Sequence, residues 1–116
     1  MSLSVHIFIK ADTLFIRLSG ELDHHTSIHL RDRINSLTDK FEIRNMVFNL
    51  KNLQFMDSSG IGVILGRYQH VKQKKGHLIV CELNAMIEKI IQLSGLLKIL
   101  IVTKDEDQAS SYLGVA

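Results

Sequence analysis

Apolar and polar residues alternate in two short stretches near the start of the chain. Every second residue from Val5 to Ile9 is apolar, and the same is true from Leu14 to Leu18. A period of two residues is typical of a strand with one buried face. Asp12 lies between the two stretches and suits a turn. The pattern predicts that the chain opens with an antiparallel hairpin.

Beyond Gly20 the pattern changes to helices that alternate with short buried strands. Apolar residues at helical spacing predict helices over about 28–41, 59–75 and 85–94, with a last helix near the end of the chain. Apolar runs predict strands over 46–50, 78–81 and 98–102. This order predicts one α/β domain over residues 1–116, with a mixed sheet, βα units after the hairpin and about four helices.

Several polar residues and glycines have the spacing of helix boundaries. Gly76 follows a lysine-rich segment and suits a left-handed cap. Asn84 is expected to cap the third helix, which ends near Gly95. Thr103 and Glu106 have the spacing of a capping box before the last helix.

Composition narrows the class of protein. The chain has 116 residues, a net charge of +2, 46% hydrophobic residues and a single cysteine, Cys81. The charge is too small to indicate nucleic acid as a partner, and one cysteine in an apolar run indicates a buried thiol rather than a disulfide. No apolar run approaches the ~20 residues that span a bilayer. We expect a cytoplasmic protein without a membrane segment.

The segment from Phe55 to Gly62 concentrates the candidate chemistry. It places Asp57, Ser58 and Ser59 where a predicted helix begins, and Gly60 and Gly62 directly after them. One cap needs one such polar residue, so three in a row exceed that requirement. Two glycines lower helix stability by ~1 kcal/mol each relative to alanine. The cluster is expected to cap the helix, hold an anion or present a hydroxyl to another protein.

Two other sites are weaker alternatives. The glycines resemble a nucleotide-binding loop, but about nine residues separate Gly60 from the strand predicted to end at Leu50. The simpler interpretation of Gly62 and Gly66 is close helix packing. His25 and His29 have a spacing that can chelate zinc, but His24 and the nearby acids do not complete a usual ligand set. We therefore predict no metal and no cofactor. We also predict no catalytic residue, because the sequence has no nucleophile elbow.

A phospho-aspartate receiver domain is the more serious alternative. Asp57 follows a central strand and Lys104 follows the last one. A receiver, however, opens with a βα unit and places two acids after its first strand, whereas this chain opens with a hairpin in which Asp12 stands alone. A receiver-type domain phosphorylated on Asp57 is therefore a less favoured alternative.

Two motifs resemble those of a known family. The segments 20–26 (Gly-Glu-Leu-Asp-His-His-Thr) and 55–68 are similar to the STAS domain, and more narrowly to sporulation anti-sigma factor antagonists of endospore-forming bacteria. The likeness covers nearly the whole chain, and the last helix carries little of it.

This resemblance implies a regulatory protein rather than an enzyme. Ser58 is expected to be phosphorylated by an anti-sigma factor that is also an ATP-dependent serine kinase. The unphosphorylated form is expected to bind that kinase and displace the sigma factor, and a PP2C-type phosphatase is expected to reverse the modification. The matching positions give the expected partner-binding residues: Asp23, Asp57, Ser59, Gly60, Ile61 and Gly62.

Electrostatics adds a hypothesis about the switch. A phosphate would add roughly −1.5 to −2 charge beside Asp57. Arg67 lies nine residues after Ser58, ~13 Å along a helix, and Lys51 is the one cation expected in a nearby loop. We therefore predict that phosphorylation blocks an interface by charge and bulk without refolding the domain.

Overall fold

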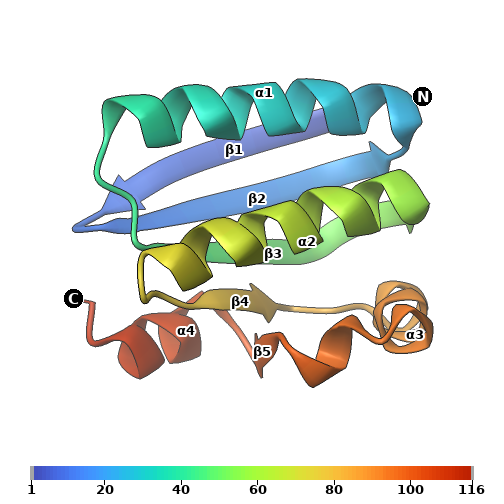
Figure 1. The fold of residues 1–116 in the computed structure, drawn as a ribbon. Coiled ribbons are helices and arrows are strands. Elements are labelled where there is room, and N and C mark those ends of the chain that lie inside the picture. The colour runs from blue at the N-terminus through green and yellow to red at the C-terminus, as the bar shows by residue number, and fades with distance from the viewer. Residues whose placement is uncertain (1, 116) are drawn as a thin grey trace.

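Five strands form one mixed sheet in the order β1-β2-β3-β4-β5 (Figure 1). The structure is a computed structural model that describes residues 2–115. β1 (Leu3–Lys10) pairs antiparallel with β2 (Thr13–Leu22), which confirms the opening hairpin. β3 (Asn45–Met56), β4 (Leu78–Cys81) and β5 (Ile101–Thr103) then pair in parallel, each with the strand before it.

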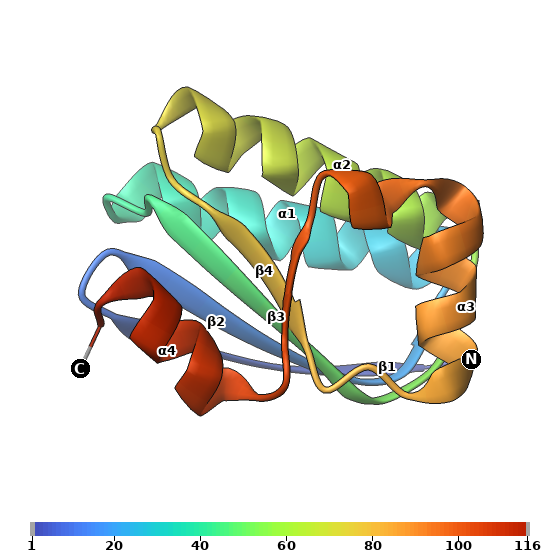
Figure 2. The ribbon, with the colours of Figure 1, turned by 90° about the horizontal axis from the view of Figure 1, so that it is seen from below.

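Helices connect the parallel strands and cover both faces of the sheet. They are α1 (His24–Lys40), α2 (Ser58–Gln73), α3 (Ala85–Ser94), the 3-10 turn η1 (Leu96–Lys98) and α4 (Glu106–Leu113). Figure 2 shows α1 and α2 on one face, α4 on the other and α3 at one end of the sheet. The expected α/β fold, with about four helices, is confirmed for residues 2–115.

The two faces of the sheet carry separate hydrophobic clusters. The larger one lies beneath α1, α2 and α3 and includes Ile16, Phe48 and Ile64, each fully buried. The smaller one lies beneath α4 and includes Phe15 and Cys81. Strands covered on both faces read as continuous apolar runs, which is why residues 46–50 and 78–81 were recognisable in the sequence.

β2 and β3 are longer than their apolar runs. β3 continues through residues 51–56, where only Leu53 and Met56 are buried, and β2 continues past Gly20 to Leu22. Leu22 pairs with Met56, so these two parallel strands end side by side. The expected gap of about nine residues between strand and Gly60 was therefore wrong, because β3 ends at Met56.

Three boundary predictions also need correction. Lys75, not Gly76, has the left-handed backbone, with φ 59°. Gly76 is required for another reason, since a Cβ there would overlap the carbonyl oxygen of Arg44. The predicted strand over 98–102 is instead η1 followed by a shorter β5.

The capping box predicted for the last helix is absent. Asp105 caps α4 by accepting from the N–H of Gln108 at 2.8 Å, while the Thr103 hydroxyl donates to the Asp105 carbonyl. The side chain of Glu106 instead forms hydrogen bonds with residues of β2 and β3. The caps predicted at Asn84 and Gly95 are confirmed, and Gly95 has φ 81°.

None of the helices within residues 2–115 has the length and apolar character needed to cross a membrane.

Candidate functional site

Two helices begin side by side at the carboxyl ends of β2 and β3. Asp23 directly follows β2 and caps α1, while Asp57 directly follows β3 and caps α2. Figure 1 shows both helices starting at the same end of the sheet. The first N–H groups of a helix lack intrahelical partners, so this end of the molecule presents two sets of backbone donors and two carboxylates together.

Asp57 holds the start of α2 in place. Its carboxylate accepts from the N–H of Ser59 at 2.9 Å and from the N–H of Gly60 at 3.4 Å. Asp57 itself has an extended backbone, which suits a cap residue. Its side chain is thus occupied with the backbone, and the hydroxyl of Ser58 is left outside this cap.

Ser58 is the first residue of α2 and is exposed. Its neighbours Asp57 and Ser59 are small and partly buried. A hydroxyl at this position is accessible to a docked protein, and the helix start tolerates an added anion. The placement is the one that the phosphorylation prediction requires, and the modification itself stays a prediction.

Asp23 forms a complete capping box at the start of α1. Its carboxylate accepts from the N–H of Thr26 at 2.9 Å, and the hydroxyl of Thr26 accepts from the N–H of Asp23 at 2.9 Å. The hydrogen bond from the Thr26 backbone lowers the pKa of Asp23 below its ordinary value. Asp23 is therefore an anion beside the Ser58 region at neutral pH.

A side-chain contact joins the two helix starts. Nδ1 of His24, one residue after the cap of α1, lies 3.4 Å from Oγ of Ser59, two residues after the cap of α2. His25 and His29, considered above as zinc ligands, lie together on α1 with ring centroids 5.0 Å apart. Within residues 2–115, no three histidine, cysteine or acidic side chains are grouped closely enough to hold a metal ion.

The glycines after Ser59 have different environments. Gly60 is buried, and a Cβ there would lie 2.6 Å from Cγ of Met56 and 2.9 Å from the Leu22 side chain. Beyond the adjoining backbone of α2, no atom of the described residues lies within 4 Å of a Cβ added at Gly62 or Gly66. Close packing therefore explains Gly60, and the prediction that it explains Gly62 and Gly66 was wrong.

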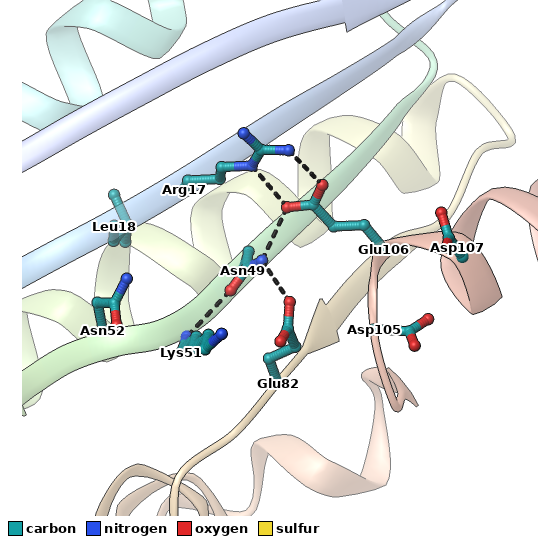
Figure 3. Close-up of a pocket in the computed structure, with 9 residues that line it drawn as sticks. All are labelled: Arg17, Leu18, Asn49, Lys51, Asn52, Glu82, Asp105, Glu106 and Asp107. Atoms are coloured by element: carbon teal, nitrogen blue, oxygen red, sulfur yellow. Dashed lines mark hydrogen bonds and ion pairs between the residues drawn. The ribbon is translucent and has the colours of Figure 1, made fainter.

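A cavity of about 390 Å³ lies on the other face of the sheet, under α4. In Figure 3 the amide of Asn49 lies between two carboxylates, donating to Glu106 at 2.7 Å and to Glu82 at 2.8 Å. Arg17 donates two 2.8 Å hydrogen bonds to Glu106. These side chains satisfy one another and fix α4 to β2 and β3, which gives the cluster a structural role.

Lys51 was expected in a loop near Ser58. It lies instead on β3 and lines this cavity under α4 (Figure 3). Lys51 therefore lies away from the N-termini of α1 and α2, where Ser58 is found. The same is true of the ion pair of Arg17 and Glu106. The predicted site therefore retains Asp23, Asp57 and the residues that begin α2.

The sheet order excludes the receiver alternative. A receiver has an all-parallel sheet in the order 2-1-3-4-5, whereas β1 here lies antiparallel at the edge and the strands follow chain order. The glycine loop of a dinucleotide site lies in the turn after a strand, whereas Gly62 and Gly66 lie inside α2. The fold supports neither alternative use of the Asp57–Gly62 segment.

The STAS domain model matches residues 5–109, and the chain belongs to this family. The chain is 43% identical over 115 residues to an anti-sigma F factor antagonist of Paenibacillus polymyxa, covering 99% of this chain and 98% of that protein. It is 36% identical over 88 residues to the protein of the same name from Lysinibacillus sphaericus, covering 76% and 75% of the two chains.

Two solved structures of SpoIIAA share the fold. The unphosphorylated anti-sigma factor antagonist SpoIIAA aligns with a TM-score of 0.84 at 29% identity, covering 97% of this chain and 99% of its own. The phosphorylated form of the Bacillus cell fate determinant SpoIIAA aligns with a TM-score of 0.74 at 29% identity, covering 94% and 99%. The resemblance found in the two sequence motifs thus extends to the whole fold.

Proposed function

We propose that this protein is an anti-sigma factor antagonist controlled by phosphorylation of Ser58. In this proposal the unphosphorylated protein binds an anti-sigma factor that is also a serine kinase, and the sigma factor is released. Phosphorylation of Ser58 ends the complex, and a PP2C-type phosphatase restores the binding form. The protein acts in the cytoplasm. It is not an enzyme in this proposal, because ATP and the catalytic base belong to its partner.

The exposed hydroxyl of Ser58 at the first residue of α2 is the observation that carries this proposal. Phosphoryl transfer requires an acceptor oxygen in line with the γ-phosphate, so the acceptor must stand clear of its own domain. Asp57 has its carboxylate directed to the backbone of residues 59 and 60, which leaves the serine side chain free for the kinase. Relatives named as anti-sigma F factor antagonists support the same assignment.

The proposed partner surface surrounds Ser58 and includes Asp23, Asp57, Ser59, Ile61 and Gly62. All five are at least partly exposed. Gly60, predicted to contact the partner, is buried against Leu22 and Met56, so we assign it the role of seating α2 on the core. Its neighbours on the helix make the contact instead.

Phosphorylation would switch this surface through electrostatics. The phosphate would bring roughly −1.5 to −2 charge to a helix start that already carries the carboxylates of Asp23 and Asp57. Like charges that face one partner weaken its docking without a change in fold. The SpoIIAA fold aligns with this chain in both its unphosphorylated and its phosphorylated form, which supports a switch that leaves the domain folded.

The test is incubation with the cognate anti-sigma factor kinase and ATP, followed by mass spectrometry. We expect one phosphate, on Ser58, that survives mild hydroxylamine as a serine ester does and an aspartyl phosphate does not. Ser58→Ala should stay unmodified and still bind the kinase, and Ser58→Asp should bind at least tenfold more weakly. Ser36→Ala removes an exposed serine of α1 outside this surface, so it is the matched control and should still be phosphorylated. Modification at another residue, or equal binding by both Ser58 variants, would refute the proposal.

A further inference from the structure

A groove runs between α1 and α2, directly below the helix starts that carry Ser58. It encloses about 330 Å³ and is lined by nine residues at helical spacing, four from α1 and five from α2. They are His24, Ser27, Ile28, Arg31, Ser59, Gly62, Val63, Gly66 and Arg67. We name it the α1–α2 groove. The groove was not recognised from the sequence, because nothing in the sequence indicates that these residues of α1 and α2 face one another.

Missing side chains keep the α1–α2 groove open. Gly62 and Gly66 are four residues apart, so they lie on the same side of α2. Beyond the adjoining backbone of α2, neither would bring a Cβ within 4 Å of an atom of the described residues. A helix interior loses roughly 0.5–1 kcal/mol for each glycine relative to alanine. Since no close packing inside the domain requires these two, an occupant from outside explains them better.

Positive charge and unused donors line the α1–α2 groove. Arg67 is partly buried, and its NH1 atom is buried without a hydrogen-bond partner among residues 2–115. Burial, followed by the nearby charge of Arg31, lowers the pKa of Arg67. Arg31 has one weak ion pair, 3.5 Å to the neighbouring Asp32. No carboxylate is among the nine residues that line the groove.

Ser27 adds a second unused polar group. It is only 4% exposed, and its Oγ is buried without a hydrogen-bond partner in the described part of the chain. Leaving a buried donor unsatisfied costs ~1–3 kcal/mol. The unpaired hydroxyl of Ser27 and the unpaired NH1 of Arg67 share one groove with a second arginine, Arg31, and indicate a site that is completed by an acceptor carrying negative charge.

We propose that the α1–α2 groove receives the carboxylate of an acidic side chain on the anti-sigma factor kinase. This inference rests on the proposed function and specifies how the kinase is held. A carboxylate supplies two acceptor oxygens, which suit the planar donors of an arginine. The donors of Arg67 and Ser27 in the groove are not used by hydrogen bonds within the domain. Ile28 and Val63 provide apolar walls for the stem of that side chain.

The position of the α1–α2 groove favours a protein over a free anion as the source of the carboxylate. Ser59 lines the groove and directly follows Ser58, so one partner can contact both. Nine residues along a helix separate Ser58 from Arg67, ~13 Å, which lies well within the footprint of one interface of ~800 Å² per partner. A carboxylate anchored at Arg67 would thereby orient the kinase over the hydroxyl it modifies.

Binding of the kinase to variants, measured by titration calorimetry on unphosphorylated protein, tests this. Arg67→Gln should weaken binding at least tenfold, and Arg31→Gln should weaken it by a smaller factor. Arg33→Gln is the matched control, because it removes the same charge from α1 at a position outside the α1–α2 groove. It should bind within about twofold of the unmodified protein.

Gly66→Leu provides a second test that does not depend on removing a charge. Leucine is a better helix former than glycine and should raise the melting temperature while filling the groove. We expect binding at least tenfold weaker from this more stable protein. This variant keeps the proposal testable even if Arg67→Gln alters the fold.

The outcomes separate this inference from the proposed function. If the unmodified protein neither binds the kinase nor is phosphorylated by it, the proposed function fails. If it binds and is phosphorylated on Ser58 while Arg67→Gln and Gly66→Leu bind equally well, only the groove assignment is wrong. Saturation of the α1–α2 groove by inorganic phosphate at micromolar concentration would identify a free anion as the occupant and overturn the proposal.

Discussion

The backbone N–H of Asp57 donates a hydrogen bond to the carbonyl oxygen of Leu22 at 3.3 Å. This bond joins the last residue of β2 to the residue that caps α2, and Asp23 follows immediately as the cap of α1. The two caps are therefore fixed relative to one another by the sheet. A partner that docks here meets a preorganised surface, which lowers the entropic cost of binding.

Asp57→Ala should lower the free energy of unfolding by ~1 kcal/mol, since the N–H groups of Ser59 and Gly60 lose their acceptor. Urea unfolding followed by circular dichroism measures the change. Asp57→Asn keeps a capping oxygen and should stay within a few tenths of a kcal/mol. Equal losses for both variants would mean that the charge, rather than the cap, stabilises α2.

Substitution of glycine by alanine should have opposite effects at two positions of α2. Gly60→Ala should destabilise the protein by ~1–3 kcal/mol, because its Cβ would overlap Met56 and Leu22. Gly62→Ala has open space and should stabilise it by roughly 0.5–1 kcal/mol. Thermal melts of the two variants provide the comparison. Stabilisation by both would contradict the assignment of Gly60 to the core.

The ion pair of Arg17 and Glu106 predicts a pH-dependent contribution to stability. Hydrogen bonds from Arg17 lower the pKa of Glu106. A carboxyl with a lowered folded pKa stabilises the protein above its unfolded value, near 4.3, and loses that contribution as pH falls through the folded value. Glu106→Gln should therefore cost about 1 kcal/mol at pH 7, because Arg17 is largely exposed.

The difference between the unmodified protein and Glu106→Gln should shrink steadily below about pH 4. Urea midpoints measured from pH 7 to pH 3 follow this directly. Asp39→Asn removes an exposed carboxylate of α1 and serves as the control for the change in net charge. A difference that stays constant across the range would show that Glu106 acts through packing alone.

Cys81 should be unreactive in the folded protein. Its side chain is fully buried, and burial together with the nearby carboxylates raises the pKa of the thiol to about 12. Because the thiolate is the reactive form, labelling by an aromatic disulfide reagent at pH 8 should proceed only as fast as the protein opens. Sub-denaturing urea should accelerate it. Complete labelling within the mixing time would contradict this environment.

The sequence predicted well those features that depend on neighbours along the chain. The hairpin turn at Asp12 and the cap at Asn84 follow from local chemistry, and both are found. Features that depend on distant partners were missed. Glu106 has the spacing of a capping box, but it pairs with Arg17, 89 positions away in the chain. Asp105 was equally suited to the cap and took that role.

The length of β3 shows the same limitation. Residues 51–56 lack a continuous apolar run because only two of them are buried, so nothing in their hydrophobicity distinguished strand from loop. Pairing with β2 decides the outcome there. Similarly, Ser58 was proposed from a motif along the chain, whereas the α1–α2 groove lined by Arg67 depends on α1 lying beside α2.

Gly62 and Gly66 imply that thermal stability and binding of the partner place opposite demands on α2. A protein engineer who sought heat tolerance alone would replace both with alanine, since each position accepts the extra methyl without a clash. Such a chain would survive higher temperatures, and under the proposed function it would bind the kinase poorly. The same proposal predicts that natural variants with these replacements are well folded in the cell and defective in releasing the sigma factor.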